Sequence, residues 1–409
     1  MSDRIQPIKE GAESKPVKTS TFRIEKQRYN WIDQARGFVM FMLVVSGLMP
    51  ELWRKANDFT WFFLEHPNDS THVTYMNLYD IGVPAFFFII GLLMAVSFHK
   101  RVDKYGPGPA IANAVLRWGL IAAVGILFII IPGVLNGDSP DVWFGDVKDI
   151  ISGPGELYAY VVYWDVVISL GVVGLASIPF MFLKRTPRLV VSYAMMVFYQ
   201  VMLMIPETHW RDYAISSVHG GIIGGFLVLV PIVLIASVVG EFFILDAETS
   251  HHEKIKKFLL LGLVNLAIGV VLWLIPGGYP NKRQDTMSWA TISLAVCFFV
   301  GYLFILIDYK DERYKELNPV NKGRIKLLKA YGMNPFLVYA IAEITAVVIK
   351  ALLGPDFEIQ LATWLILVPA ITIVVLLLEW KGKAISTTKV ALGVIITVVI
   401  LAAVLIPFL

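Results

Sequence analysis

The sequence predicts an all-α polytopic membrane protein, a bundle of about 11 transmembrane helices with a cytoplasmic N-terminus. Of its 409 residues, 57% are hydrophobic and only 16% are charged, and the mean hydropathy is +0.67. This composition excludes an ordinary soluble globular domain. Apolar runs of about 18–25 residues, long enough to cross a bilayer, recur along the chain. We therefore expect an integral, multi-pass protein of the lipid bilayer, which in a prokaryotic cell would be the cytoplasmic membrane.

The chain divides into two parts of unequal size. Residues 1–30 are polar and carry both signs of charge, which predicts a flexible cytoplasmic arm. Residues 31–409 form a single transmembrane domain. The expected spans are 32–50, 78–99, 110–134, 157–183, 189–206, 219–244, 257–276, 287–308, 330–353, 358–379 and 388–408.

Lysine and arginine set the expected orientation. With the N-terminus inside, 27 of the 35 basic residues fall on the cytoplasmic side. The dense loop at 310–329 contributes many of them, and the other inner loops are short and basic. This asymmetry predicts an N-in, C-out topology, which places the loops at 51–77 and 277–286 on the outer face.

The sequence contains no motif for several classes of chemistry. The sequence holds no Walker motif, no GxGxxG and no metal-ligand spacing, so we expect neither a metal nor a nucleic acid partner. The pair His251–His252 is interpreted as solvated. Cys297 is the single cysteine, and no internal disulfide can form.

Ionisable residues collect at the entrance to the second span. His72, Tyr75, Asn77 and Asp80 precede an apolar run that contains Pro84. An aspartate at the mouth of a membrane helix needs a partner or a function, and a histidine suits proton transfer near neutral pH. The alternative is that Asp80 caps the helix and His72 is a solvated loop residue.

Other polar residues lie at or within spans. Asp33 and Arg36 are three residues apart at the start of the first span, so on a helix they can pair. Arg117 could extend to the inner surface or bind a phosphate-bearing ligand. In the ninth span, a glutamate as deep as Glu343, nine residues after Asn334, needs a polar interior. The sixth span is rich in glycine at 220–225, which favours close helix packing.

Four motifs, in order, resemble the transmembrane acyltransferases related to heparan-α-glucosaminide N-acetyltransferase. The opening helix resembles D-x-x-R-G, and the second helix resembles D-L-V-F-P-x-F-x-F-I-x-G. A loop further on resembles P-x-N-K-(K/R), and the ninth span resembles G-M-N-x-x-x-V-Y-x-x-x-E. In this chain the motifs begin at Asp33, Asp80, Pro280 and Gly332. They cover residues 33–343, which is most of the chain.

The resemblance implies an enzyme that takes an acetyl group from cytosolic acetyl-CoA to a sugar amine across the membrane. By its pattern His72 is the catalytic histidine, with His66 second. Tyr75 stands in place of a tryptophan, Ser46 in place of an asparagine, and Asp285 near the usual position of an aromatic. These departures face the acceptor side, so the acceptor is left open as a carbohydrate or another small molecule with an amine or hydroxyl.

The expected site has three groups of residues. A histidine with an orienting carboxylate supplies a base, and Asn334 or Lys282 could stabilise an oxyanion. Cations at the inner side would hold the nucleotide end of acyl-CoA. The predicted catalytic residues are His72, Asp80 and Asn334; the predicted donor-binding residues are Asp33, Arg36 and Arg117; the predicted acceptor-binding residues are Tyr75, Asn281, Lys282, Ser288 and Glu343.

Two other classes of function remain open from the sequence. A secondary transporter or flippase would also have many spans, glycine-rich packing and an intramembrane glutamate. The absence of two-half symmetry in the sequence, and the clustering of ionisable groups at helix ends, count against it. An inactive membrane scaffold with this fold is the third reading. Acyl chain length is left open, and a homodimer is compatible with the chain.

Overall fold

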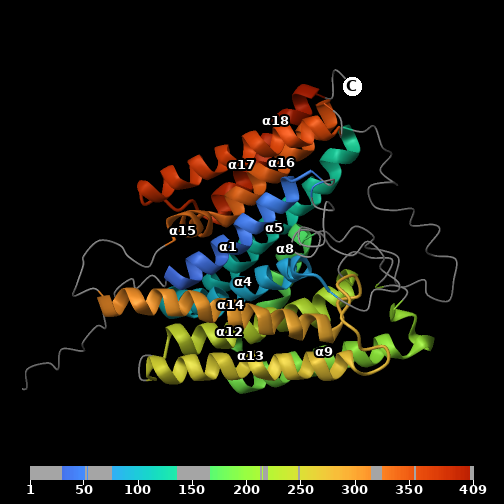
Figure 1. The fold of residues 1–409 in the computed structure, drawn as a ribbon, viewed down its shortest axis with the longest axis vertical. Helices are drawn as coiled ribbons and strands as arrows, with labels where there is room; N and C mark the ends of the chain where they lie inside the picture. Colours follow the sequence, from blue (N-terminus) through green and yellow to red (C-terminus); the bar gives the residue numbers. More distant parts are fainter. Residues whose placement is uncertain are drawn as a thin grey trace, which may run out of the picture.

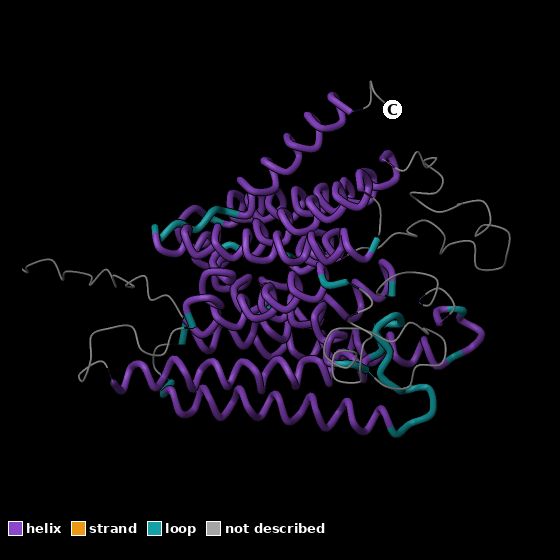
Figure 2. Tube along the Cα trace, turned by 45° about the horizontal axis from the view of Figure 1, so that its top comes forward, coloured by secondary structure: helices purple, strands orange, loops and turns teal. Residues whose placement is uncertain are grey.

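The protein is a bundle of helices in the computed structural model. It describes residues 30–50, 53, 76–135, 166–211, 214, 220–246, 249–314, 325–353 and 356–405. Within these ranges every regular element is helical (Figures 1 and 2). Eight helices of the described residues are long and apolar enough to cross a membrane, and shorter apolar helices lie at 166–182, 335–345 and 387–398. The chain is therefore a polytopic helical membrane protein.

The helices coincide with the expected spans but differ at their ends. α13 begins before residue 257 and α14 continues past residue 308, because a helix rich in charged residues can extend beyond the hydrocarbon layer. The long elements are α1 (Asn30–Leu48), α4 (Gly82–Tyr105), α5 (Pro107–Leu135), α8 (Val166–Ser177), α9 (Arg185–Met204), α12 (Val230–Ile244), α13 (His251–Trp273), α14 (Met287–Tyr314), α15 (Lys326–Met333), α16 (Pro335–Leu353), α17 (Phe357–Trp380) and α18 (Thr387–Leu405). The short ones are η1 (Leu78–Ile81), η3 (Pro179–Phe182), η4 (Pro206–Thr208), α11 (Gly221–Gly224) and η5 (Gly225–Leu229).

Two central helices, α4 and α12, pack backbone against backbone. Every residue from Val230 to Phe243 is buried, as expected for a helix that is apolar on all sides. A Cβ on Gly240 would lie 1.8 Å from the carbonyl oxygen of Leu92, so only glycine permits this crossing. The glycine-rich segment at 220–225 instead begins the span and leads into the π-helical turn η5. Within the same pair of helices, a Cβ on Gly91 would lie 2.5 Å from the Val233 carbonyl oxygen, so glycine is needed on both sides of the crossing.

The ninth expected span is not one continuous helix. α15 ends at Met333, Asn334 has φ −132° and ψ 50°, and α16 starts at Pro335. A proline disfavours helical geometry in the preceding residue, which explains a break at this position. The prediction of an uninterrupted helix over 330–353 was wrong here. The break turns the Asn334 side chain toward the segment between α17 and α18.

Different polar contacts are found at the two ends of the bundle. At the end where α1 begins, the Trp31 N–H donates to Asp308, and Lys329 pairs with Glu379 at 3.0 Å. At the opposite end, the Trp289 indole donates to the Asp80 carbonyl at 3.2 Å. We call these the Asp33 end and the Asp80 end. The predicted topology would place the Asp33 end at the inner face and the Asp80 end at the outer face, and this orientation stays a prediction.

The periphery is apolar and open. On α17, Leu365, Ile366 and Ile373 are 54%, 69% and 58% exposed. A contiguous exposed apolar surface of this kind is expected on a helix that faces lipid. Figure 1 places α17 and α18 at one margin of the bundle and α13 at the other.

Candidate functional site

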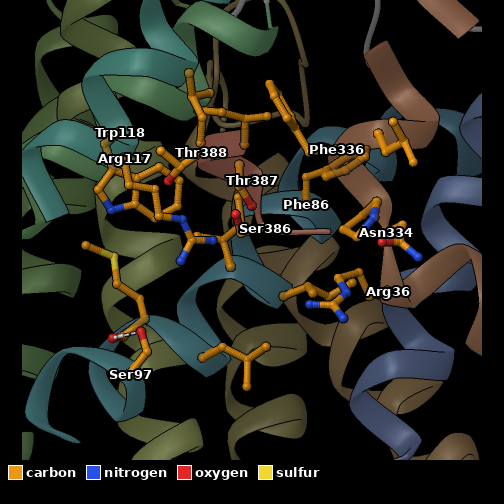
Figure 3. Close-up of a pocket in the computed structure, with 18 of the residues that line it drawn as sticks. Arg36, Phe86, Ser97, Arg117, Trp118, Asn334, Phe336, Ser386, Thr387 and Thr388 are labelled. Carbon is orange, nitrogen blue, oxygen red and sulfur yellow. Dashed lines mark hydrogen bonds between the residues drawn. The ribbon is translucent and has the colours of Figure 1, made fainter. Parts of the chain in front are cut away.

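A cavity of about 490 Å³ opens between helices near the Asp33 end of the bundle. Its walls come from α1, α4, α5, α8, α16 and the start of α18 (Figure 3). Along α4 it is lined from Arg101 to Phe86, which corresponds to roughly 22 Å of helix at 1.5 Å per residue. The cavity is therefore elongated in the direction in which the helices cross the bilayer.

Four cations line this cavity. They are Arg36, Lys100, Arg101 and Arg117, and none of the lining residues is an aspartate or glutamate. Arg36 Nη2 lies 2.6 Å from Asp33 Oδ1, which confirms the predicted i,i+3 pair. Asp33 balances part of this charge, and the remaining excess of positive charge on the cavity wall favours an anionic ligand.

Arg117 is held against an aromatic ring. Its guanidinium lies 4.9 Å from the centroid of the Trp118 ring. Its Nε is inaccessible to solvent and makes no hydrogen bond among the residues that the structure describes. Figure 3 shows Arg117 and Arg36 on opposite sides of the cavity, with Ser386 and Thr387 between them in this view. A buried donor without a partner is a preferred place for an anion or an ordered water.

Apart from the cations and a few uncharged polar residues, the cavity wall is apolar. Leu93, Ile90 and Phe86 follow one another along α4 away from the cations, and Val166 and Phe336 line the wall from α8 and α16. Phe86 is six residues from Asp80, roughly 9 Å along a helix. The cavity thus combines a cationic end with an apolar channel that approaches the Asp80 end.

Asn334 lies at the cationic end of the cavity, with its amide engaged. Its Oδ1 accepts the Ile385 N–H at 2.7 Å, and its Nδ2 donates to the Lys383 carbonyl at 3.3 Å. The side chain is 1% exposed. These contacts support a positioning role, and the predicted oxyanion role would require the amide to leave them.

Asp80 lies at the opposite end. Its Oδ2 accepts the Asn77 N–H at 2.9 Å, and the residue is 2% exposed. The Lys282 ammonium lies 5.8 Å from the ring centroid of the neighbouring Tyr79. The loop after α13 is therefore brought against the start of the second span, as the predicted catalytic and acceptor-binding roles require.

The loop at 281–286 is a compact hydrogen-bonded turn. Asn281 Oδ1 accepts the Gln284 N–H at 2.9 Å, and its own N–H donates to Thr286 Oγ1 at 2.9 Å. Thr286 Oγ1 is 3.2 Å from Ser288 Oγ. Asn281 and Ser288 are thus engaged in shaping the loop that presents Lys282.

Asp285 is the unusual residue of this loop. It is completely buried, neither carboxylate oxygen has a hydrogen-bond partner among the described residues, and its φ is +50°. Burial raises the pKa of its carboxyl well above the ordinary value, and the nearby Lys282 opposes that shift. The departure noted in the sequence is therefore a desolvated carboxyl in a strained turn.

The predicted site residues fall into separate groups. Asp33, Arg36, Arg117 and Asn334 gather at the Asp33 end, where all but Asp33 line the cavity. Asp80, Asn281, Lys282 and Ser288 gather at the Asp80 end. Glu343 lies on α16 and is not among the residues that line the cavity. His66, His72 and Tyr75 lie outside the described residues, so their predicted roles stay predictions.

The sequence analysis missed a buried ion pair at the Asp33 end. Arg188, taken as a loop residue, is 1% exposed and lies 2.7 Å from Glu241 Oε1. Its guanidinium also donates to the carbonyls of Met181 and Leu183. The Nδ1 atom of His99 lies 3.5 Å from the same carboxylate oxygen. Glu241 on α12 was the available signal, because a glutamate near the end of an apolar span requires a partner.

The fold defines a polytopic membrane protein, and its cavity combines cationic and apolar lining residues. Residues 29–380 match the model of the acyltransferase domain family Acyl_transf_3. Because this match covers most of the chain, the protein belongs to that family and is a membrane acyltransferase. No curated protein matches the chain.

Proposed function

We propose that the protein transfers an acetyl or other short acyl group from cytosolic acyl-CoA to an acceptor at the outer face. The acceptor would be a sugar amine or hydroxyl, as in the acyltransferases related to heparan-α-glucosaminide N-acetyltransferase. Membership of the acyltransferase domain family supports group transfer. The identity of the donor and the position of the acceptor at the outer face are our proposals.

One observation carries the choice of donor. The cavity joins Arg36, Lys100, Arg101 and Arg117 to an apolar channel, with no carboxylate on its wall. Coenzyme A has the same polarity, with phosphates at one end and a long, largely uncharged arm that bears the thioester at the other. Arginine suits phosphate because its fork can bind two oxygens at once. The residues present therefore fit an acyl-CoA.

The chemistry would take place toward the Asp80 end. We assign His72 as the base that accepts the proton of the acceptor's N–H or O–H, or as a transient acyl carrier. Asp80 would orient the imidazole, as a carboxylate does in other acyl-transfer sites. The new bond joins the acyl carbon to the acceptor's nitrogen or oxygen, the C–S bond breaks, and the thiol leaves with a proton. We assign Asn334 or Lys282 to stabilise the oxyanion. The candidate acceptor-binding residues are Tyr75, Asn281, Lys282, Ser288 and Glu343.

Donor binding tests the proposal directly. Calorimetry should detect acetyl-CoA binding to the purified protein, and Arg117→Ala should weaken it by about 1.5–3 kcal/mol, the usual contribution of a charged hydrogen bond. Lys104→Ala is the control, because Lys104 is an exposed cation on α4 outside the cavity. Wild-type affinity in Arg117→Ala would remove this arginine from the site. No binding of acetyl-CoA by the wild type would favour a transporter or flippase instead.

A further inference from the structure

The segment between α17 and α18 forms part of the cavity wall. Residues 381–388, which we call the connector, follow the end of the matched family domain at residue 380. Ser386, Thr387 and Thr388 all line the cavity beside the four cations. The connector is thus a portion of the cavity that lies outside the family match.

The start of the connector is fixed by the end of α17. The Gly382 N–H donates to the Glu379 carbonyl at 2.8 Å, and the Lys383 N–H donates to the Leu378 carbonyl at 2.9 Å. This is the hydrogen-bond pattern of a Schellman motif, and Gly382 has the left-handed φ of +62° that the motif requires. The direction in which the chain leaves α17 is therefore specified by local structure.

The middle and the end of the connector are also fixed. Asn334 binds the backbone on both sides of residue 384, through Lys383 and Ile385. Ser386 then caps α18, because its carbonyl accepts the Val390 N–H at 3.1 Å and its Oγ accepts the Lys389 N–H at 3.4 Å. The hydroxyls of Thr387 and Thr388 are consequently presented at the first turn of a long helix.

These positions suit a phosphate group. The first turn of a helix has N–H groups without intrahelical partners and carries the positive end of the helix dipole. A helix N-terminus alone does not define a site, but this one shares a cavity with four cations. In the same cavity Arg117 Nε is buried without a hydrogen-bond partner among the described residues. Threonine hydroxyls, backbone N–H groups and an arginine fork together bind phosphate oxygens well.

We propose that Thr387, Thr388 and the N-terminus of α18 form a phosphate subsite for the nucleotide end of the donor. This inference rests on the proposed function, because it names the part of the chain that holds the donor's phosphate. Asn334 is then a positioning residue, which acts by holding the connector against the cavity. The phosphate of an anionic lipid headgroup has the same chemistry, so the experiment must separate the two sources.

The test compares ligands with and without phosphate. Binding of acetyl-CoA and of S-acetylpantetheine, the same arm without any phosphate, is measured for the wild type and for Thr387→Val/Thr388→Val. We expect the double variant to bind acetyl-CoA roughly tenfold or more weakly, since hydrogen bonds to a charged group are lost. Its affinity for S-acetylpantetheine should equal that of the wild type. Thr387→Ser/Thr388→Ser, which keeps both hydroxyls, should restore acetyl-CoA binding.

Thr397→Val is the matched control. Thr397 is an exposed threonine on the same helix whose hydroxyl donates to the Gly393 carbonyl, and it does not line the cavity. It should leave both affinities unchanged. If the valine double variant does not fold, Thr387→Pro replaces it, because proline is tolerated at the first helical position while removing one N–H and one hydroxyl.

Three results would overturn the inference. Wild-type affinity for acetyl-CoA in the valine double variant would remove the connector from the site while leaving the proposed function standing. An equal loss for both ligands would show a general distortion of the cavity. Displacement of acetyl-CoA by phosphatidylglycerol in nanodiscs, absent in the double variant, would assign the subsite to a lipid headgroup. A wild type that binds no acetyl-CoA at all would instead refute the proposed function itself.

Discussion

The indole Nε1 of Trp289 donates a hydrogen bond to the backbone carbonyl of Asp80 at 3.2 Å, across 209 positions of sequence. Trp289 is fully buried and lies in the first turn of α14, directly after the loop that carries Lys282. The bond therefore fixes the aspartate at the start of the second span relative to that loop. Two of the sequence motifs thus meet at one end of the bundle.

The first prediction concerns the base at this end. His72→Ala should abolish acyl transfer while leaving acetyl-CoA affinity nearly intact, because the four cations lie at the opposite end. A general base alone contributes about 10²–10⁴-fold, so a larger loss would indicate an acyl carrier. His66→Ala is the control and should be nearly silent in a transfer assay. The reverse pattern would move the base six residues upstream.

The second prediction concerns orientation. Single cysteines are introduced at Arg283, in the loop beside Asp80, and at Lys257, which is exposed near the start of α13. An impermeant thiol reagent on intact cells should label position 283 and not position 257, as the lysine and arginine asymmetry requires. The native Cys297 is buried, so it should give little background. Labelling of position 257 alone would invert the topology.

The third prediction concerns the crossing of α1 and α15. A Cβ on Gly332 would lie 1.7 Å from the Asp33 carbonyl oxygen, so the two backbones are in contact. Gly332→Ala should destabilise the protein by about 1–3 kcal/mol or more, because the helices must move apart. Gly393→Ala is the control, since nothing lies within 4 Å of a Cβ there. Thermal unfolding in detergent distinguishes them, and equal melting temperatures would disprove the tight crossing.

The fourth prediction concerns the buried ion pair. Arg188→Met leaves Glu241 buried without its closest cation, and this should destabilise the protein by about 3–5 kcal/mol. Arg185→Met removes a cation whose side chain is 42% exposed, and the loss should be much smaller. The double variant Arg188→Met/Glu241→Gln should be more stable than Arg188→Met, because the buried side chain that has lost its closest cation is then neutral. A ranking with Arg185→Met as the least stable would contradict this account.

The fifth prediction concerns pH. Burial raises the pKa of Asp285 in the folded protein above the ordinary value of 3.8, which applies to the unfolded chain. At a pH between the ordinary pKa and the raised pKa, the folded protein therefore holds a proton that the unfolded chain has released. Stability should therefore fall as pH rises through that interval. Asp285→Asn should remove this dependence and raise the melting temperature at neutral pH.

Asp246 provides a contrast of opposite sign. A hydrogen bond from Thr249 lowers the pKa of this exposed carboxyl, with a contribution from Arg185. The stability that Asp246 contributes is fully present above its ordinary pKa and is lost as pH falls through the lowered pKa. Asp246→Asn should therefore leave the decline at higher pH in place. A decline that persists in Asp285→Asn would show that another group causes it.

Much of the fold could be predicted from the sequence because a bilayer imposes local rules. Span length and apolarity are properties of short segments, and eight long apolar helices of the described residues lie within or overlap the expected spans, while the fourth and ninth expected spans are interrupted. The Asp33–Arg36 pair was predictable for the same reason, since an i,i+3 spacing fixes proximity within one helix. The break at Asn334 also has a local cause, which is the proline that follows it in the sequence.

Contacts between distant segments could not be predicted in this way. Arg188 and Glu241 lie on α9 and α12, and nothing in either segment identifies the other as its partner. The connector is a similar case, because nothing near Ser386 and Thr387 in the sequence indicates that α5 and α16 complete a cavity around them. The two-ended arrangement of the candidate site depends on such long-range packing.

The four cations of the cavity also bear on stability. Arg36, Lys100, Arg101 and Arg117 line one cavity whose wall holds no aspartate or glutamate, and Asp33 pairs with Arg36 alongside it. Like charges in a partly desolvated space oppose the compact state, so we expect an anion in the cavity to stabilise the folded protein. Replacing Arg117 by methionine should then raise the melting temperature of the ligand-free protein, although it weakens donor binding. Such a conflict between rigidity and activity is a common property of sites built for charged ligands.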